Sequence, residues 1–348
     1  MKFSILLFPL VALALIAGPP RGAAQPEAKA SSTLQEIRKR GEVVCGASVP
    51  APGFAVQDSA GSWSGFDVDF CRALAVAVLD DPLKFRIEPL DRKQRLTALH
   101  SGEVDVLLSG APWTQAREAG HQLLYASITF FGGQGLLSRR AGAEGAPWRA
   151  AGGAPRVCVQ QGGSSELNLA EFYRQHGSAY TPVSFPSLEE AARAYDAAAC
   201  DLLSADVVEL HEWRARLQKP DDHVVLTQLL SKSPVGPIVR QGDDQWFNVV
   251  RWTHFAMLEA EEFGVGEKTV DAALSSDNAD LRRLVGSDGD FGEGLGLRPD
   301  WAYRVIREIG NYAEVFERNL GTSSPFAMER RLNALWTKGG LMFAPPVR

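Results

Sequence analysis

GFDVDFCRALAVAVL at residues 65–79 is followed by LTALHSGEVDVLLSG at 96–110 and APWTQAR at 111–117, and this run carries most of the information on the fold. Phe66, Phe70, Leu74 and Val78 recur every four residues, the spacing of a buried helix face over residues 66–79. The flanking sequence predicts strands at 43–46, 85–87 and 104–108, with a helix at 92–100. This alternation of strands and helices predicts an α/β layer with largely parallel strands.

The same alternation restarts later in the chain. It predicts strands at 156–159 and 200–203, helices at 166–176 and 188–197, and extended segments at 224–230 and 235–240. The Gly- and Ala-rich stretch at 139–154 is a candidate link. We therefore predict two lobes, one made of residues 31–140 and 234–348 and the other of residues 141–233. The length of 348 residues suits two such lobes.

Residues beyond 241 read as a helical section. Apolar periodicity predicts its helices at 244–262, 270–274, 280–284, 301–319 and 328–336.

The N-terminus has the pattern of an export signal. Lys2 precedes an apolar run at 3–17, two prolines end that run, and small residues at 22–24 offer a cleavage site. We expect a signal peptide over residues 1–24 and a periplasmic product; a second small-residue site at 28–30 leaves the start of the mature chain open by a few residues. A retained anchor is the alternative, although the apolar run is short for a membrane span.

Four cysteines in an exported chain suggest two disulfides, and three pairings are open. Cys45 and Cys71 lie in the first predicted lobe, Cys158 and Cys200 at equivalent places in the second, and we predict a disulfide within each pair. Neither the cysteine spacing nor the six histidines match a metal site, and no phosphate loop or nucleophile elbow is present. We expect no metal and no cofactor. The net charge of −6 argues against a nucleic-acid partner.

Taken together, the motifs resemble one family. G-F-D-V-D, T-A-L-x-S-G-E-V-D-V and W-T-x-x-R stand in the order found in bacterial extracytoplasmic solute-binding proteins, and RQGDDQWF at 240–247, NYAEVFERNLG at 311–321 and LNALWTKGGL at 332–341 resemble the general L-amino-acid-binding subgroup that serves ABC importers. The resemblance implies a type II periplasmic binding protein fold, with two α/β lobes joined by two crossover strands and a helical C-terminal section. It also implies a monomer that closes on an L-amino acid or related carboxylate and delivers it to an inner-membrane permease, without catalysis.

The resemblance assigns site residues in the first lobe. Arg117 stands where the family binds the ligand carboxylate, and a guanidinium fits a carboxylate bidentately; Thr114 can add a donor. Phe54 is a candidate for stacking on the ligand. Arg95 either binds a ligand side chain or forms a surface salt bridge.

The second lobe supplies the remaining candidates. Ser164 and Ser165 lead into a predicted helix, whose N-terminus favours an anion; a simple N-cap is the alternative for Ser165. Asp206 matches the aspartate that the family places on the ligand ammonium. Its alternative role is to cap a helix over residues 207–218.

Three positions depart from the family pattern. Pro112 replaces a threonine whose backbone N–H donates to the ligand carboxylate, and proline has no N–H. SVPA at 48–51 replaces a polar loop, and Gly132 replaces an aspartate. We infer that the protein binds a related but altered ligand, or binds amino acids with a weaker grip on the carboxylate, and that its pocket is more apolar or smaller. Two alternatives stay open: a sensory or partner-docking protein on the same fold, and a cyclohexadienyl or arogenate dehydratase with an acid such as Glu166.

Overall fold

The computed structural model describes residues 32–348 except 92, 109–110, 144, 146–147 and 150–152. The predicted signal peptide at 1–24 and the predicted start of the first lobe at residue 31 lie outside the described residues. Residues 32–348 form one compact unit. In the described part of the chain, no helix is both long and apolar enough to cross a membrane.

The first sheet has the strand order β4-β1-β5-β14-β6. Its strands are β1 (Val43–Ala47), β4 (Phe85–Pro89), β5 (Val106–Leu107), β6 (Leu123–Tyr125) and β14 (Ile238–Arg240). β4, β1 and β5 run parallel, and Cys45 of β1 pairs with Ile87 and Val106. β14 arrives from far along the chain and runs antiparallel to β5 and β6. The helices of this region are α1 (Thr33–Arg40), α2 (Phe66–Leu79), α3 (Arg95–Ser101) and α4 (Gln115–Gly120), and β2 (Val56–Gln57) pairs with β3 (Trp63–Ser64).

The second sheet has the order β10-β9-β11-β8-β12. Its strands are β8 (Gln134–Arg139), β9 (Arg156–Gln160), β10 (Thr181–Phe185), β11 (Leu202–Asp206) and β12 (His223–Val225), with helices α5 (Ser164–Gln175), α6 (Leu188–Asp196) and α7 (Val207–Arg216) and 3-10 turns η1 (Arg140–Gly142) and η2 (Pro220–Asp222). β8 runs antiparallel to β11 and β12, whereas β9, β10 and β11 are parallel. The predicted two-lobe α/β fold is thereby confirmed.

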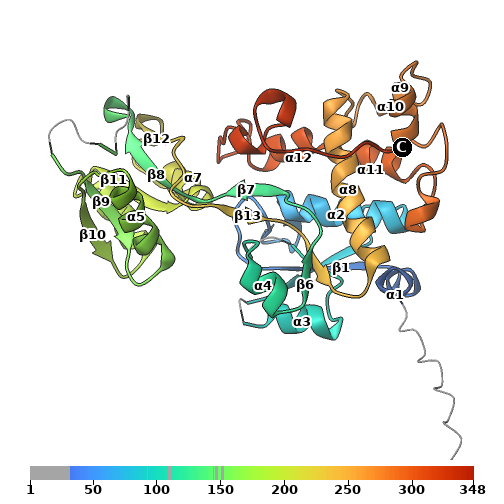
Figure 1. Ribbon diagram of the computed structural model, residues 1–348, viewed down its shortest axis with the longest axis horizontal. Helices are drawn as coiled ribbons and strands as arrows, with labels where there is room; N and C mark the ends of the chain where they lie inside the picture. Colours follow the sequence, from blue (N-terminus) through green and yellow to red (C-terminus); the bar gives the residue numbers. More distant parts are fainter. Residues whose placement is uncertain (1–31, 92, 109–110, 144, 146–147, 150–152) are drawn as a thin grey trace, which may run out of the picture. The chain divides into compact units, whose positions relative to one another are not determined.

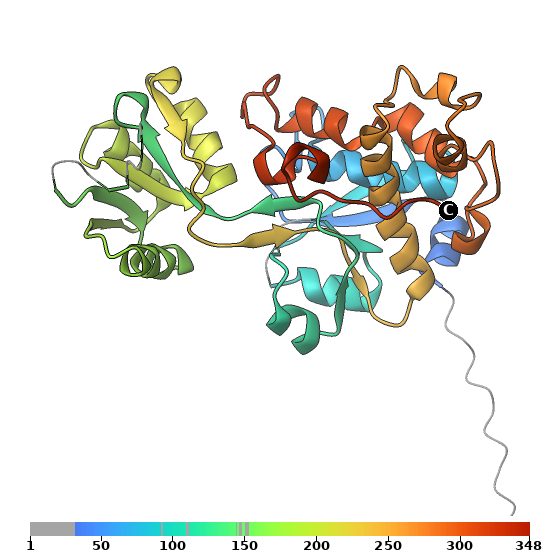
Figure 2. The same cartoon turned by 45° about the horizontal axis from the view of Figure 1, so that its top comes forward.

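Two strands carry the chain between the sheets. β7 (Phe130–Gly132) pairs antiparallel with β13 (Ser233–Val235), and both lie between the two sheets in Figures 1 and 2. Glycines let the backbone pass closely here: a Cβ on Gly133 would lie 2.2 Å from the Ser231 carbonyl oxygen, and one on Gly236 would lie 2.0 Å from that of Ser127. We call β7, β13 and these two glycines the hinge.

The hinge position bears on the predicted lobe boundaries. β8 belongs to the second sheet although we expected residues up to 140 in the first lobe. We therefore propose that the first crossing lies at residues 130–133, and not in the Gly- and Ala-rich stretch at 139–154. The second boundary, at 233/234, falls within β13 and stays a prediction.

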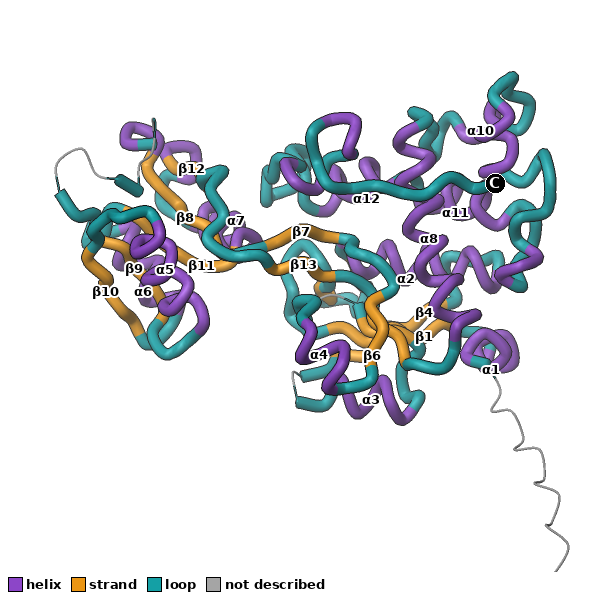
Figure 3. Tube along the Cα trace, in the orientation of Figure 1, coloured by secondary structure: helices purple, strands orange, loops and turns teal. Residues whose placement is uncertain are grey.

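The C-terminal section is helical, with two corrections. It contains α8 (Asp244–Glu262), α9 (Val270–Ala273), α10 (Ala279–Leu284), α11 (Trp301–Ile309) and α12 (Tyr312–Asn319), followed by short 3-10 turns (Figure 3). The single helix predicted at 301–319 is wrong, because Gly310 leaves the helix with φ +92° and Asn311 with Glu314 forms a capping box that starts α12. The helix predicted at 328–336 is also wrong: only the 3-10 turns η4 (Arg331–Asn333) and η5 (Trp336–Lys338) form there.

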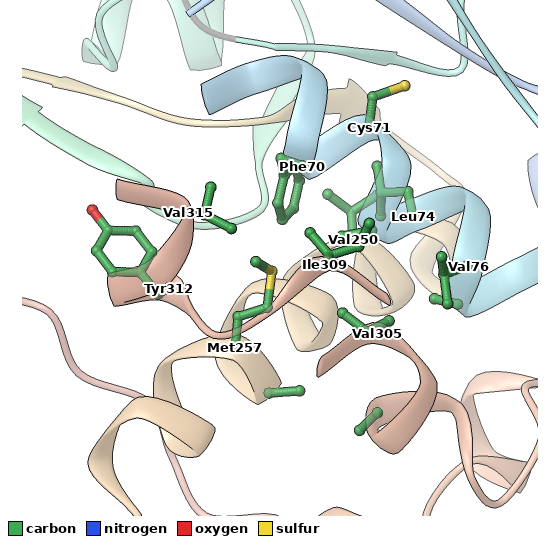
Figure 4. Close-up of a cluster of buried hydrophobic side chains, with 14 of the residues drawn as sticks. Phe70, Cys71, Leu74, Val76, Val250, Met257, Val305, Ile309, Tyr312 and Val315 are labelled. Carbon is green, nitrogen blue, oxygen red and sulfur yellow. The ribbon is translucent and has the colours of Figure 1, made fainter. Parts of the chain in front are cut away.

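The main core lies between the first sheet and the C-terminal section. α2 packs on α8, α11 and α12, and side chains of all four helices meet in Figure 4. Cys71 of α2 forms a disulfide with Cys45 of β1, and Cys158 of β9 forms one with Cys200 just before β11. Both predicted pairings are confirmed. Each disulfide ties a helix or strand to its own sheet, so neither spans the hinge.

Candidate functional site

A cavity of about 580 Å³ lies against the hinge, and we call it the ligand cleft. The first-sheet region, the hinge strands and α7 all contribute to it. Its lining is Ser48, Val49, Pro50, Ala51, Pro52, Phe54, Asp67, Leu90, Asp91, Pro112, Phe130, Gly132, Asp206, Val208, Glu209, Glu212, Ser233 and Val235. Phe54 and Asp206, two predicted site residues, lie in this lining. The loop at 48–52 is mostly apolar, but five carboxylates also line the cleft, and the expectation of a more apolar pocket stays a prediction.

Arg117 lies behind the cleft wall. Thr114 is the N-cap of α4 and its hydroxyl accepts from the Arg117 N–H at 3.4 Å. The Arg117 guanidinium donates through Nη1 to the Pro112 carbonyl at 2.6 Å, and the Tyr125 hydroxyl donates to the same oxygen at 3.1 Å. Pro112 therefore supplies an acceptor where the family pattern has a donor. In this arrangement part of the guanidinium is bound to the protein's own backbone.

Arg95 belongs to the same group of side chains. Burial raises the pKa of Tyr125, and the positive charges of Arg117 and Arg95 oppose that rise. Both guanidinium groups are thus near the tyrosine that holds the Pro112 carbonyl. The structure brings these two predicted arginines together, although neither is part of the cleft lining.

Asp206 is placed by the end of β11 and the start of α7. Its carboxylate accepts from the Val208 N–H at 3.0 Å, so the predicted capping role is real, and the same residue lines the cleft. Burial raises the pKa of Asp206 to about 7, and the nearby charge of Glu209 acts in the same direction. Among the described residues no cation forms an ion pair with Asp206. A ligand ammonium would supply that missing charge.

Phe54 forms part of an aromatic cluster. Its ring meets Phe130 of the hinge edge to face at 5.3 Å and Phe66 of α2 at 5.8 Å. With 6% of its surface exposed, Phe54 is packed in the core and also lines the cleft. A Cβ on Gly65 would lie 2.1 Å from the Phe54 carbonyl oxygen, so the glycine that opens α2 permits this packing.

Ser164 and Ser165, the two predicted serines, lie in the second lobe at the start of α5. α5 begins at Ser164 with Gly163 as N-cap, so Ser165 is not the N-cap that we weighed as its alternative. The Ser165 carbonyl accepts from Gln134 Nε2 at 2.7 Å, and Gln134 also donates to Ser204 at 2.8 Å. Neither serine lines the cleft in this structure.

Sequence reasoning missed four carboxylates of the cleft: Asp67, Asp91, Glu209 and Glu212. Asp67 was inside the G-F-D-V-D motif, which was a usable signal. Glu209 and Glu212 follow Asp206 by three and six residues, so helical spacing from Asp206 would have placed them on one side of α7. Among the described residues, no group of three or more potential metal ligands is arranged to hold an ion.

Comparison with known proteins decides the family. The profile of bacterial extracellular solute-binding proteins, family 3, matches residues 43–268. The chain belongs to this family. It is 45% identical over 323 residues to the general L-amino acid-binding periplasmic protein AapJ of Rhizobium johnstonii, covering 92% of this chain and 94% of that protein.

Further relatives agree with this assignment. The glutamate/glutamine/aspartate/asparagine-binding protein BztA of Rhodobacter capsulatus is 40% identical to this solute-binding protein over 350 residues, covering both proteins completely. A periplasmic binding protein of an ABC transporter from Brucella ovis, solved with glutathione bound, matches with a TM-score of 0.77 and 44% identity over 91% of this chain and 100% of that one. The predicted resemblance to amino-acid-binding periplasmic proteins is confirmed.

Proposed function

We propose that this protein is the periplasmic binding component of an ABC importer for L-amino acids or related α-amino compounds. It takes up its ligand in the cleft beside the hinge and presents the closed form to an inner-membrane permease. The observation that carries the proposal is that Asp206 lines the cleft with no ion-pair partner among the described residues, while Arg117 binds the carbonyl of Pro112, another residue of the cleft lining, in a family of solute-binding proteins. The names of the relatives support an amino-acid ligand.

The assignment of roles follows from charge. A free amino acid has an ammonium and a carboxylate on one carbon, and both must find partners on leaving water. Asp206 receives the ammonium. Arg117 receives the carboxylate after its Nη1 leaves or shares the Pro112 carbonyl, and Thr114 adds a hydroxyl. Ser164 and Ser165, at the start of α5, approach the carboxylate on closure, and Arg95 contacts the ligand side chain.

The altered wall at Pro112 affects how the ligand carboxylate is held. Because a backbone donor is missing there, the first lobe holds the α-carboxylate that all these ligands share less strongly than in the family pattern. The glutathione complex of the Brucella ovis relative supports including γ-glutamyl peptides among the candidates. We therefore place tripeptides of this size beside free amino acids in the ligand class.

The dehydratase alternative named Glu166 as its general acid, a role that requires a place in the cleft. Glu166, the candidate for that role, lies outside the cleft lining, and hydrogen bonds from Ser184 and Gly162 lower its pKa. The relatives named above are binding proteins. We further propose that the protein acts as a monomer.

A thermal-shift screen tests the proposal. The protein is stripped of ligand by unfolding and refolding, then screened against all L-amino acids, glutathione and prephenate. A ligand at 100 times its dissociation constant adds about 2.7 kcal/mol of stability, which shows as a rise in the melting temperature. We expect a shift with at least one α-amino compound and its loss in Arg117→Ala, while Arg298→Ala, which removes an exposed arginine remote from the cleft, keeps it. No shift with any α-amino compound would contradict the proposal and favour the docking role, and turnover of prephenate would identify an enzyme.

A further inference from the structure

Helix α7 lies between two cavities. Val208 and Glu212, one helical turn apart, line the ligand cleft. Val207 and His211, also one turn apart, line a second cavity, which we call the rear cavity. In the hinge, Gly132 lines the cleft, Phe131 lines the rear cavity, and Phe130 lines both. The helix that carries Asp206 at its start therefore has one face toward the ligand and one toward the rear.

The rear cavity is closed by the C-terminal section. Its lining includes residues 328–334 with Lys338 and Gly339, which follow α12 in the chain and belong to the body of the first sheet. Figure 1 shows this C-terminal segment in red on the side of α12, and α7 where the hinge strands meet the second sheet. The first-lobe body thus meets α7 from two sides: the loop at 48–54 across the cleft, and the C-terminal section across the rear cavity.

Direct hydrogen bonds join the second lobe to the C-terminal section at the rear. The Arg331 guanidinium donates to the carbonyls of Leu226 at 2.8 Å and Val225 at 2.9 Å. His211 Nδ1 lies 2.9 Å from the Phe326 carbonyl; because a carbonyl only accepts, this nitrogen carries the proton. Arg214 donates to the same carbonyl at 3.1 Å. Four donors therefore cross from one lobe to the other at the rear.

The same segment also holds the hinge itself. The Asn333 side chain accepts from the Phe131 N–H at 2.6 Å and donates to the Phe131 carbonyl at 3.2 Å. The side-chain amide of Asn333 thus forms the same pair of hydrogen bonds with β7 that the backbone of a neighbouring strand would form. Asn333 is buried, which fixes the geometry of this contact. The C-terminal section is consequently anchored to the first lobe and the hinge while its arginine reaches the second lobe.

We infer that residues 326–333 form a rear brace that holds the lobes apart and thereby sets the ligand affinity, an inference that rests on the proposed binding function. Movement of α7 toward the loop at 48–54 closes the cleft on a ligand. The same movement carries α7 away from Phe326, whose carbonyl is bound by His211 and Arg214 on the rear side of the helix. It also carries the carbonyls of residues 225 and 226, in the same lobe, away from Arg331. Closure therefore breaks the rear hydrogen bonds, and the brace stabilises the open form relative to the closed form.

The brace predicts an affinity change without any contact to the ligand. When the binding-competent state is a small fraction of the population, the apparent dissociation constant equals the intrinsic one divided by that fraction. Hydrogen bonds from a charged group are among the stronger ones in proteins. Removing the two that Arg331 makes should raise the closed fraction, and so tighten ligand binding, by about tenfold.

Titration calorimetry of Arg331→Ala tests the brace, with the amino acid that gives the largest shift in the wild type. The matched control is Arg140→Ala: Arg140 likewise donates to a backbone carbonyl, that of Asp221 at 2.6 Å, but within the second lobe. We expect tighter binding in Arg331→Ala and an unchanged constant in the control. His211→Phe, which removes a different rear donor, should also tighten binding. Unchanged or weaker binding in both rear variants, with melting curves that show a folded protein, would overturn the inference.

A ligand-free measurement separates the brace from the proposed function. Small-angle X-ray scattering of the stripped protein reports the average separation of the lobes. Arg331→Ala should have a smaller radius of gyration than the wild type and the Arg140→Ala control, even if no amino acid binds. If the wild type binds nothing but the variant is more compact, the proposed function fails and the brace stands. An equal radius of gyration in all three proteins contradicts the brace.

Discussion

Replacing Asp206 by Asn should stabilise the ligand-free protein while removing its ability to bind. The Asp206 carboxylate is buried beside the cleft, and burial raises its pKa to about 7 from an ordinary value of 3.8. Asn keeps an oxygen that can accept from the Val208 N–H, so the cap of α7 survives. The substitution removes the buried charge and little else.

The direction and the size of the expected stability change follow from the raised pKa of Asp206. Because the folded state holds the proton more tightly than the unfolded state, stability falls as the pH rises from about 4 to about 7, and the full cost is present above pH 7. A difference of about 3 pKa units corresponds to about 4 kcal/mol. Because the carboxylate lines a cleft that solvent enters, this figure is an upper bound, and we expect Asp206→Asn to gain between about 1 and about 4 kcal/mol at pH 8. The gain should be smaller at pH 5.

Chemical denaturation of the stripped wild type and variant at pH 5 and pH 8 measures this gain. The contrasting control is Asp201→Asn: hydrogen bonds from Arg156 lower the pKa of Asp201, so this change should cost stability at pH 8. The reasoning is refuted if Asp206→Asn is no more stable than the wild type at pH 8, or if its advantage does not shrink at pH 5. An unimpaired response of Asp206→Asn to amino acids would refute the assigned ammonium contact.

Two further predictions concern the scaffold. Gly133→Ala should destabilise the protein by more than about 2 kcal/mol in chemical denaturation, because the new Cβ would lie 2.2 Å from the Ser231 carbonyl oxygen, whereas Gly294→Ala, with nothing within 4 Å, should change stability by less than about 1 kcal/mol. Equal effects of the two would contradict the close approach at the hinge. Replacing Cys158 and Cys200 together by Ala should cost about 4 kcal/mol, from the 42-residue separation that the disulfide closes, and a melting temperature equal to that of the wild type would contradict this.

Regular elements were predictable wherever one face is buried over several turns. The bounds predicted for helices at 66–79 and 244–262 agree with α2 and α8, since both cross the core with apolar residues at helical spacing. The break at Gly310 was missed because Ile309 and Tyr312, on either side of it, are both buried and preserve an apolar periodicity across the gap. The sequence feature that could have predicted a new helix start at this position was the capping-box pair Asn311 and Glu314.

The candidate site was predictable only in part. The place of Asp206 beside the cleft and the missing N–H of Pro112 could be predicted from motif order and residue type, while the ligand contacts of both stay predictions. The contact between Arg117 and the Pro112 carbonyl depends on how the chain turns into α4, which no spacing specifies. The rear contacts could not be predicted from the sequence. Arg331 and Leu226 are 105 residues apart, and a contact at that separation produces no periodic pattern of residue types.

Isothermal titration of the ligand-stripped protein with L-amino acids tests the central claim most directly, in the wild type and in Arg117→Ala. The account predicts a single site with one ligand per chain for at least one L-amino acid, and a loss in Arg117→Ala of about tenfold or more in affinity, the size of a charged hydrogen bond. Absence of binding for every amino acid, or equal affinity in the Arg117→Ala variant, would contradict it.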